Sequence, residues 1–381
     1  MRQLKIRFKK YNDVWKNVKL TETAPIVMGQ SPDSKNYTDN PNDYILVQGN
    51  ADMQNGRVVP RVWTTQITKL AEKGDLILSV RAPVGDVGKT DYNVVLGRGV
   101  AAIKGNEFIF QLLSRMKQSN YWSKLSTGST FESINSNDIK SAEIYLPSPE
   151  EQSAIGSLLR TFDDLLASYK DNLANYQSLK AIMLSKMFPK DGQTSPEIRL
   201  DGFKGEWENK ILSEVTNITM GQSPKSENYT DNPNDYILVQ GNADIKDKQV
   251  VPRLWTTEVT KMAEIGDIIL TVRAPVGDIG KTDYNVVIGR GVAAIKGNDF
   301  IFYTLEKMKM TGFWNRFSTG STFDSISSND IKEAIIQIPT LKEQQAIGSY
   351  FSNLDNLISA HQEKIFQLET LKKKLLQDMF I

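Results

Sequence analysis

The sequence predicts an α+β protein made of two mixed α/β domains of one fold and two long helices. The first observation is that the chain of 381 residues repeats itself, so that most of its first half returns in its second half. The second is that each copy starts with short β-rich runs separated by Gly, Pro and Asn. Each copy then ends in a long stretch with the apolar periodicity of a helix.

The repeat is a tandem duplication with a single offset and no gap. A unit of about 190 residues is too long for a solenoid repeat and suits a whole domain followed by a helix. The matching positions are MGQSP at Met28 and Met220, RAPVGD at Arg81 and Arg273, STGSTF at Ser126 and Ser318, and the outer limits Trp15 with Trp207 and Phe188 with Phe380.

The first part of each copy predicts a mixed α/β domain. The runs 44–47 and 75–80 are rich in β-forming residues and are bounded by turn residues, as short strands are. A helix-like segment lies near 107–117. We therefore expect strands and at least one helix before the long helical stretch begins.

The second part of each copy predicts a long helix with a defined start. Ser148, Pro149 and Glu151 supply an N-cap hydroxyl, a proline at the first helical position and a glutamate at the capping-box position. Thr340 and Glu343 repeat this cap. Apolar residues then recur at alternating spacings of four and three, and these seam residues are Ile155, Leu159, Phe162, Leu166, Tyr169 and Leu173 in the first copy and Ile347, Phe351, Leu354, Ile358, His361, Ile365 and Leu368 in the second.

A narrow apolar seam needs a partner, and each helix is the obvious partner of the other. Alternatively, each helix packs only on its own domain, but the sustained periodicity favours helix on helix. At ~1.5 Å per residue, a helix of about 40 residues is ~60 Å long. The pair is therefore predicted to hold two similar domains at a fixed separation.

Composition and charge limit the possible classes of protein. The formal net charge is +1, so the chain is not expected to bind a polyanion by overall charge alone. There is no cysteine, which excludes disulfides and thiolate metal sites and fits a reducing compartment. No apolar run is suited to secretion or to crossing a bilayer, and the expected location is the cytoplasm.

The sequence offers little support for catalysis by this chain. Its single histidine, His361, falls on the apolar seam, which favours a packed imidazole over a metal ligand or general base. The motif GDVGKT at Gly85 resembles the end of a phosphate-binding loop, but Pro83 stands where that motif requires its first glycine. Hairpin glycines are the better interpretation, and no catalytic, cofactor-binding or metal-binding residue is predicted.

Polar side chains in the predicted loops suit contacts with DNA. Asn and Gln can pair with adenine and Arg with guanine in the major groove, while Arg and Lys also bind phosphates. A solvated or structural role stays open for each, since a recent duplication preserves residues whatever their function. The candidates are Gln30, Ser31, Asn36, Tyr37, Gln48, Asn50, Arg61, Arg81, Lys89, Arg98, Ser126, Thr127, Ser129 and Thr130, with the counterparts Gln222, Ser223, Asn228, Tyr229, Gln240, Asn242, Arg253, Arg273, Lys281, Arg290, Ser318, Thr319, Ser321 and Thr322.

Several motifs together carry a family resemblance that covers essentially the whole chain. From Thr127 to Phe188, and again from Thr319 to Phe380, a Thr-Gly-Ser loop precedes an Ile-rich strand ending in Pro, a Glu-Gln helix start and a Leu-Lys-rich tail. EIRLDGFKGEWENKIL at Glu197 has the form of a domain start. These features resemble the specificity subunits of type I restriction-modification complexes.

The resemblance implies a specific architecture and set of partners. In that family two target-recognition domains, related by pseudo-twofold symmetry, are separated by a pair of long antiparallel helices, and each domain binds half of an interrupted DNA site. The helices dock two methyltransferase subunits that carry S-adenosylmethionine, and restriction/translocase subunits that use ATP and Mg join outside. This chain would be the non-catalytic specificity subunit, and the implied boundaries are 1–147 and 189–339 for the recognition domains and 148–188 and 340–381 for the helices.

Near-identity of the two domains predicts a target with matching halves, an interrupted palindrome or a site close to it. The two copies differ at Asp33 and Lys225, at Lys35 and Glu227, and between 54–57 and 246–249. These charged, turn-like differences could relax one half, although their character favours the solvated rim.

Three alternatives remain at this level. The chain could serve a methylation-only complex, or a type II-like system whose partner is a fused nuclease-methyltransferase. From another class, it could be a scaffold that does not bind DNA, with duplicated ligand-binding modules.

Overall fold

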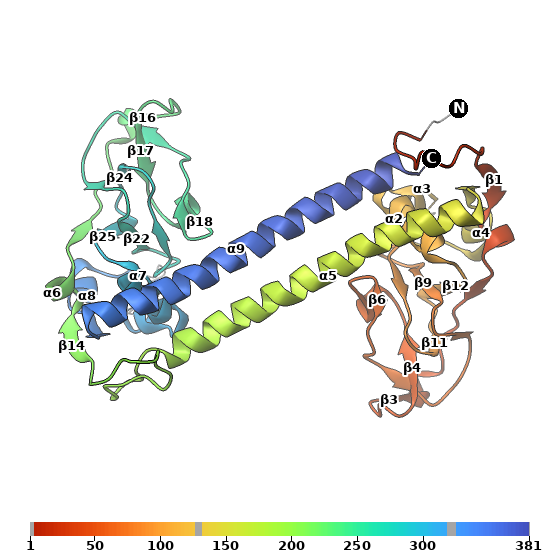
Figure 1. The fold of residues 1–381 in the computed structure, drawn as a ribbon, viewed down its shortest axis with the longest axis horizontal. Helices are drawn as coiled ribbons and strands as arrows, with labels where there is room; N and C mark the ends of the chain where they lie inside the picture. The colour runs from red at the N-terminus through yellow and green to blue at the C-terminus, as the bar shows by residue number, and fades with distance from the viewer. Residues whose placement is uncertain (1–3, 126–131, 318–324, 381) are drawn as a thin grey trace. The chain divides into compact units, whose positions relative to one another are not determined.

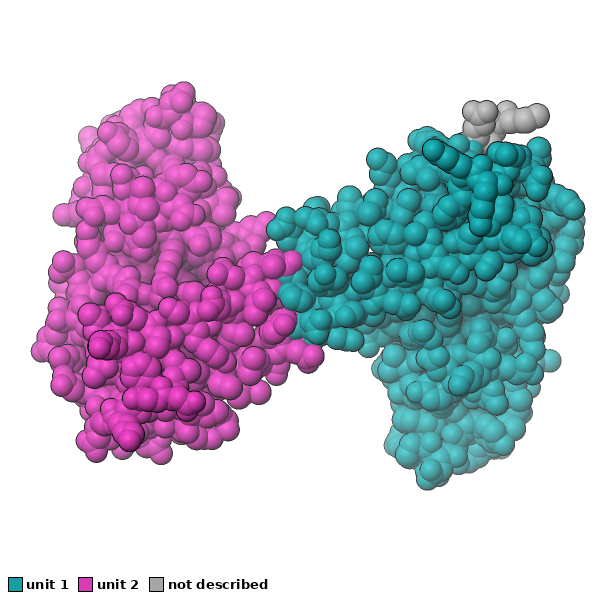
Figure 2. Space-filling model, viewed as in Figure 1, with its two compact units in different colours: residues 1–172, 361–381 teal, residues 173–360 magenta. Residues whose placement is uncertain are grey.

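A computed structural model describes residues 4–125, 132–317 and 325–380 of the chain. The chain forms two compact units, residues 1–172 with 361–381 (unit 1) and residues 173–360 (unit 2), which Figure 2 colours separately. The division falls inside both long helices, so each unit holds one sheet domain and a segment of each helix. The predicted α+β class, with two mixed-sheet domains and long helices, is confirmed (Figure 1).

The elements of the first repeat run from β1 to α5, and Figure 1 labels part of them. They are β1 Lys16–Lys19, α1 Leu20–Thr23, β2 Ile26–Met28, η1 Ser34–Asn36, β3 Tyr37–Thr38, β4 Tyr44–Val47, η2 Asn50–Asp52, β5 Met53–Gln54, β6 Arg57–Val58, β7 Trp63–Thr64, β8 Leu70–Ala71, β9 Leu76–Ser79, β10 Val87–Lys89, β11 Val94–Leu96, β12 Val100–Ile103, α2 Glu107–Gln118, α3 Tyr121–Leu125, α4 Ser136–Lys140, β13 Glu143–Leu146 and α5 Pro149–Lys186, where η marks a short 3₁₀ helix.

The second repeat forms the same elements in the same order. They are β14 Glu208–Ile211, α6 Leu212–Val215, β15 Ile218–Met220, η3 Ser226–Asn228, β16 Tyr229–Thr230, β17 Tyr236–Val239, η4 Asn242–Asp244, β18 Ile245–Lys246, β19 Gln249–Val250, β20 Trp255–Thr256, β21 Met262–Ala263, β22 Ile268–Thr271, β23 Ile279–Lys281, β24 Val286–Ile288, β25 Val292–Ile295, α7 Asp299–Met310, η5 Phe313–Phe317, α8 Ser328–Lys332, β26 Ile335–Ile338 and α9 Leu341–Asp378.

Each sheet domain contains two mixed sheets. In unit 1 the larger sheet has the order β2-β12-β9-β10-β6-β5 and the smaller one the order β3-β7-β4-β11-β8. Most neighbours are antiparallel, but β10 pairs with β6 and β11 pairs with β4 in parallel. Unit 2 repeats both orders with its own strands.

Alternation along β9 explains how the larger sheet is buried on both faces. Ile77 belongs to a cluster with Val47 and Leu96 of the smaller sheet, so this face packs sheet on sheet. Leu76 and Leu78 point the other way, into a cluster that includes residues of α2. Both sides of the strand are therefore apolar, which accounts for the unbroken apolar run in the sequence.

The long helices α5 and α9 begin at the predicted caps. The Ser148 hydroxyl accepts a hydrogen bond from the Glu151 backbone N–H at 3.3 Å. The Glu151 carboxylate does not return to the cap, since it accepts two hydrogen bonds from Arg7, both at 2.8 Å. Arg199 and Glu343 make the equivalent pair in unit 2. In each unit, an arginine before the sheet domain thus holds the start of the helix that follows that domain.

The helix segments pair in antiparallel fashion inside each unit. In unit 1, Lys170 of α5 pairs with Glu369 of α9 at 2.7 Å. Asp163 lies about two turns before Lys170 in α5, and it pairs with Lys372, which comes after Glu369 in α9. The rings of Tyr169 and His361 lie 5.3 Å apart, so the lone histidine packs on the seam as expected. All predicted seam residues of both helices are buried or half-buried.

Each long helix also completes the core of the other repeat's sheet domain. Phe380, just after α9, stacks on Phe108 of unit 1 with ring centroids 5.2 Å apart. Phe188, just after α5, stacks on Phe300 of unit 2 at 5.5 Å. The starts of the helices pack on their own domains, since Ile155 belongs to the core cluster of unit 1. Helix-on-helix and helix-on-domain packing therefore both occur.

In the part of the chain that the structure describes, no helix has the length and apolarity needed to cross a bilayer.

Candidate functional site

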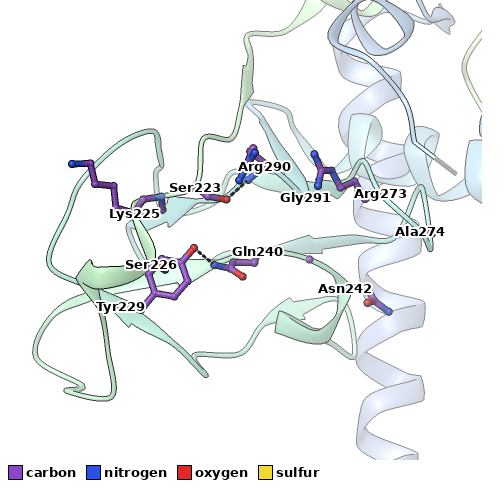
Figure 3. A pocket seen from close by; sticks show the side chains of 12 residues that line it. Ser223, Lys225, Ser226, Tyr229, Gln240, Asn242, Arg273, Ala274, Arg290 and Gly291 are labelled. Carbon is purple, nitrogen blue, oxygen red and sulfur yellow. Dashed lines mark hydrogen bonds between the residues drawn. The ribbon is translucent and has the colours of Figure 1, made fainter. Parts of the chain in front are cut away.

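A polar pocket lies in unit 2 where several strands end (Figure 3). Ser223 follows β15, Gln240 follows β17, Arg273 follows β22 and Arg290 lies between β24 and β25. The cavity measures about 510 Å³. Its lining consists of Ser223, Pro224, Lys225, Ser226, Tyr229, Gln240, Gly241, Asn242, Arg273, Ala274, Arg290 and Gly291.

The side-chain amide of Gln240 has a fixed orientation in this pocket. Its Nε2 donates a hydrogen bond to the Tyr229 hydroxyl at 2.7 Å, as Figure 3 shows. This bond uses one N–H, so the second N–H and the Oε1 acceptor remain for other partners. A glutamine with one donor and one acceptor presented together matches the edge of adenine in the major groove.

The backbone around Gln240 is held by the buried carboxylate of Asp244. One oxygen of that carboxylate accepts hydrogen bonds from the backbone N–H groups of Gln240 at 2.7 Å and Gly241 at 3.1 Å. The loop therefore keeps its shape without a regular strand. Gly291 explains how close the neighbouring chain comes, because a Cβ at this position would overlap the Gln240 carbonyl oxygen.

Two arginines complete the polar lining of the pocket. The backbone N–H of Arg290 donates to the Ser223 hydroxyl at 3.1 Å, and the backbone of Arg273 forms a β-bridge with Ser325. Both residues are exposed, and neither guanidinium has a hydrogen bond or ion pair with another described residue. A fixed backbone with an unpaired guanidinium suits the binding of a phosphate or a guanine.

The equivalent residues of unit 1 make the same contacts. Gln48 Nε2 donates to the Tyr37 hydroxyl at 2.7 Å, and the Ser31 hydroxyl accepts from the Arg98 backbone N–H at 3.0 Å. The Arg81 backbone bridges to Ser133 as Arg273 does to Ser325. The same oriented amide and arginines are thus present in both sheet domains.

Two other pairs of candidate residues contact partners outside the pocket. Arg61 donates to the Ala51 carbonyl at 2.9 Å and so supports the loop after β4, as Arg253 does for its own loop. Lys89 forms an ion pair with Glu107, and Lys281 forms one with Asp299.

Asn36 and Asn228 also bond within the protein, and Glu258 accepts the Asn228 amide at 2.7 Å. The pKa of Glu258 is lowered, because its carboxylate accepts hydrogen bonds from the Lys225 backbone N–H and from Asn228. The side chains of Gln30 and Gln222 are exposed and do not line the pocket, whereas Asn242 does. Asn50 is the half-buried counterpart of Asn242 in unit 1. The remaining candidates Ser126, Thr127, Ser129, Thr130, Ser318, Thr319, Ser321 and Thr322 lie outside the described residues.

Of the differences between the repeats, Lys248 is not on the solvated rim that the sequence favours, whereas Lys225 is exposed as that interpretation expects. Lys225 lines the pocket, although its loop looks like an ordinary turn in the sequence. Lys248 pairs with Glu306 at 2.5 Å and with Asp355 at 3.2 Å. Sequence alone could not find these roles, because both depend on residues distant in the chain.

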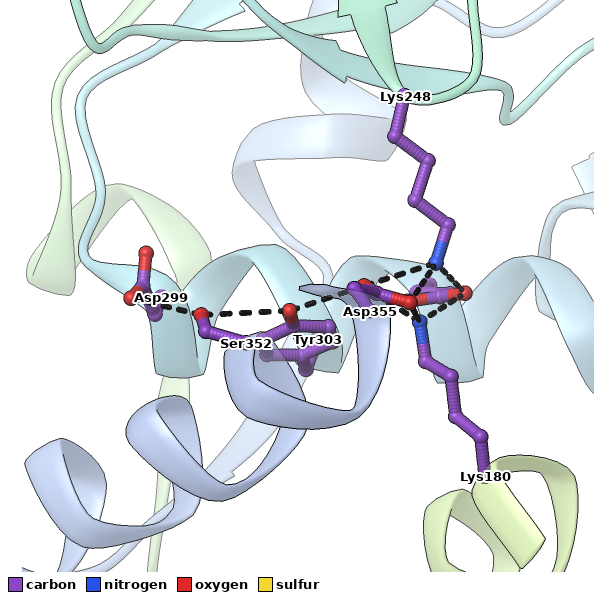
Figure 4. Close-up of polar contacts among 7 residues, drawn as sticks. Lys180, Lys248, Asp299, Tyr303, Ser352 and Asp355 are labelled. Carbon is purple, nitrogen blue, oxygen red and sulfur yellow. Dashed lines mark hydrogen bonds and ion pairs between the residues drawn. The ribbon is translucent and has the colours of Figure 1, made fainter. Parts of the chain in front are cut away.

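Lys248 belongs to a charged network that attaches the sheet domain of unit 2 to its helices (Figure 4). Lys180 of α5 contacts Asp355 of α9 at 2.6 Å and Glu306 of α7 at 2.9 Å, and its side chain is 6% exposed. The Tyr303 hydroxyl donates to Asp355 at 3.0 Å. Burial lowers the pKa of Lys180, whereas Glu306 and Asp355, against the cost of burial, raise the pKa of Lys248.

Unit 1 has a simpler version of this network. Lys372, the counterpart of Lys180, pairs with Asp163, which also accepts a hydrogen bond from Gln111 at 2.7 Å. Gly56 and Ser114 stand where unit 2 has Lys248 and Glu306, so the second lysine and the second carboxylate are missing. The lysine and aspartate at the helix crossing are common to both units, and both lysines continue the seam spacing of their helices.

Replacing Lys180 by methionine should destabilise unit 2 strongly. The change leaves Glu306 and Asp355 without their most buried partner, and breaking such a buried pair costs about 3–5 kcal/mol. Hydrogen exchange should localise the loss of protection to unit 2, and denaturant unfolding should measure its size. The control Lys170→Met removes a half-exposed ion pair and should cost less than about 1 kcal/mol. Equal effects of the two changes would contradict the importance of this network.

Among the described residues, no group of three or more His, Asp or Glu side chains is placed to hold a metal ion.

Comparison with known proteins identifies the family. The model of the type I restriction modification DNA specificity domain matches residues 12–175 and 204–370, which is most of each repeat. The chain belongs to this family. The two matches fall on the two copies found in the sequence, so each copy carries one specificity domain with the greater part of its helix.

Curated relatives in Methanocaldococcus jannaschii agree with this assignment. A protein named for the specificity subunit of type I restriction enzyme MjaX is 30% identical over 281 residues, covering 71% of this chain and 66% of that protein. The MjaIX specificity subunit is 26% identical over 185 residues, covering 43% and 41%. The chain thus matches less than two thirds of the length of these relatives.

Solved structures share the fold along the whole chain. The S subunit of a type I restriction-modification system from M. genitalium has a TM-score of 0.70 at 16% identity, covering 100% of this chain and 99% of that one. A chain from a structure of complex assembly and conformational transition of the type I R-M system has a TM-score of 0.56 at 23% identity, covering 97% and 98%. At these identities the likeness concerns the fold of a specificity subunit.

Proposed function

We propose that this chain is the DNA sequence-specificity subunit of a type I restriction-modification complex, in which each sheet domain binds one half of a bipartite site. The observation that carries the proposal is the pocket at Gln240, Arg273 and Arg290, whose contacts recur in the other domain at Gln48, Arg81 and Arg98. The family membership of the chain agrees with this function.

The chemistry of the pocket suits base and phosphate recognition. Specificity in the major groove comes from amide and guanidinium groups presented in fixed positions, and phosphate contacts set the register. The glutamine amide is fixed by the tyrosine hydroxyl, so it loses little conformational entropy when it binds a base. The arginines supply charge locally, which a chain of net charge +1 lacks globally.

The long helices have two proposed roles. They set the spacing between the half-sites, because each is a single helix of 38 residues that joins the two units. They also dock methyltransferase subunits, for which exposed apolar side chains are available: Leu165 is 43% exposed, Ile182 47% and Phe366 69%. Apolar side chains exposed on a surface are a common feature of protein interfaces.

Catalysis in this proposal belongs to the partner subunits. Methyltransferase subunits would carry S-adenosylmethionine, and restriction subunits would use ATP and Mg. This chain would supply DNA specificity only, and purified chain with DNA and S-adenosylmethionine should give no methyl transfer.

Methylation mapping of the host genome tests the proposed function. Because the two domains present the same pocket contacts, we expect an interrupted site with the same sequence in both halves, read on opposite strands. Deletion of the gene should remove methylation at that site. Two clearly different half-sites would refute the equivalence of the domains, and no loss of methylation on deletion would refute the function.

A binding assay separates this function from that of a scaffold. The full chain with its methyltransferase partner should shift a duplex that contains the mapped site more strongly than one with a scrambled site. A scaffold that does not bind DNA would show no sequence preference.

A further inference from the structure

The pocket of unit 2 and the equivalent surface of unit 1 differ at a single position. Twelve residues line the pocket of unit 2, and eleven of them are identical at the equivalent positions of unit 1. The exception is Lys225, whose counterpart is Asp33. The difference reverses the charge of one side chain in an otherwise repeated surface.

The reversal gives the unit 2 pocket and the equivalent surface of unit 1 different charges toward DNA. In unit 2, Lys225, Arg273 and Arg290 are all positive. In unit 1 the equivalent positions carry Asp33, which is negative, and the arginines Arg81 and Arg98. A lysine can bind a phosphate as a point charge, whereas a carboxylate repels it.

The backbone at this position is held in the same way in both units. The Lys225 N–H donates to the Glu258 carboxylate and the Asp33 N–H donates to the Gln66 side-chain oxygen, both at 2.8 Å. Each residue also begins the same short 3₁₀ turn, as the residue before η1 or η3. The units therefore differ in the side chain at this point and not in the path of the loop.

Among the described residues the Lys225 side chain has only an exposed ion-pair partner, whereas the Asp33 carboxylate also accepts a hydrogen bond from the Lys35 backbone N–H at 3.2 Å and so caps η1. Lys225 is 3.7 Å from Glu227, and the two side chains are 75% and 72% exposed. Asp33 is 3.3 Å from Lys35, again with both side chains exposed. Exposed pairs of this kind contribute little, so Lys225 can exchange its partner for a phosphate at small cost.

We propose that the two domains bind the same half-site sequence with unequal affinity, because Lys225 contacts a DNA phosphate that Asp33 repels. The inference rests on the proposed DNA binding by this pocket. A phosphate contact acts on every sequence, so it changes affinity without changing the bases that are recognised.

The natural differences between the repeats provide the variants. The triple change Asp33→Lys, Lys35→Glu and Gln66→Glu gives unit 1 the side chains that unit 2 already carries at Lys225, Glu227 and Glu258. The reciprocal triple change gives unit 2 the side chains of unit 1. Each set is already accommodated by the same fold elsewhere in the chain, so folding should be retained, and an unchanged melting temperature checks this.

The two triple variants separate a local contact from the effect of overall charge. The first gains two charges at position 33, loses two at 35 and loses one at 66, so its formal net charge falls by one. If overall charge controlled binding, this variant would bind DNA more weakly. A phosphate contact at position 33 predicts the opposite.

The experiment measures binding of the full chain, with its methyltransferase partner, to a duplex carrying the mapped site and to a scrambled duplex at several salt concentrations. The first variant should bind both duplexes about tenfold more tightly than the wild type, and the reciprocal variant about tenfold more weakly. The slope of log K against the logarithm of the salt concentration should become steeper by about 1 in the first variant and shallower by about 1 in the reciprocal variant. The variant with all six substitutions carries both exchanges, and its affinity for a symmetric site should equal that of the wild type.

The outcomes distinguish the two proposals. Sequence-specific binding that is unchanged in both variants, or that follows overall charge, overturns the inference while the proposed function stands. A change in the preferred bases instead of a uniform change in affinity also overturns it, since position 33 would then contact a base. Absence of any preference for the mapped site refutes the proposed function itself.

Discussion

Replacing Arg81 and Arg273 by alanine together should lower affinity for the mapped site at least about thirtyfold, because each guanidinium is assigned a base or phosphate contact and a good bidentate base contact is worth about 1–3 kcal/mol. Neither guanidinium bonds to another described residue, so the change should leave the fold intact. Methylation of the target in cells should be lost accordingly. Competition binding with site and scrambled duplexes measures the effect.

The control for this experiment removes the same amount of charge elsewhere. Arg57 and Lys246 are exposed and do not line the pocket of unit 2 or the equivalent surface of unit 1. The double variant Arg57→Ala and Lys246→Ala should lower binding to both duplexes slightly and equally. If the control lost as much specific binding as the arginine variant, the pocket would not be the recognition site.

Lengthening both long helices by three heptads should lengthen the spacer between the half-sites by about nine base pairs. Three heptads keep the seam in register and add ~32 Å, close to the ~34 Å of one DNA turn, so each domain would meet its groove from the same side. The insertions belong after Asn172 and after Ala360, where the two compact units divide. Methylation mapping in cells that carry the variant reads the new spacer directly.

A single added heptad in each helix is the matched control. It also preserves the seam, but it adds only ~10 Å, or about a third of a DNA turn, and so places the domains out of phase with the groove. We expect methylation to be lost with this variant and to return, at the longer site, with three heptads. Methylation of the original site by the three-heptad variant would show that the helices do not set the spacing.

The architecture could be predicted from local features of the chain. The repeat fixed the number of domains, and the spacing of four and three from Ile155 to Leu173 identified the seam, because helical periodicity is a local property of the chain. Gln48, Arg81 and Arg98 are also among the candidates from the sequence, because amide and guanidinium groups in predicted loops are recognisable without coordinates.

Which candidates lie together could be seen only in the folded chain. Arg61 and Lys89 are basic candidates like Arg81 in the sequence, but the fold gives them a carbonyl and a carboxylate as partners. Lys225 lines the pocket because the ends of strands that are distant in the sequence lie close together in the fold.

The packing of the residues just after the long helices could not be predicted from the sequence either. Periodicity indicated that the helices pair, but not that Phe380 enters the core beside Phe108. A partner distant in the chain leaves no local pattern, since burial and ion pairing depend on which surfaces meet once the backbone is folded.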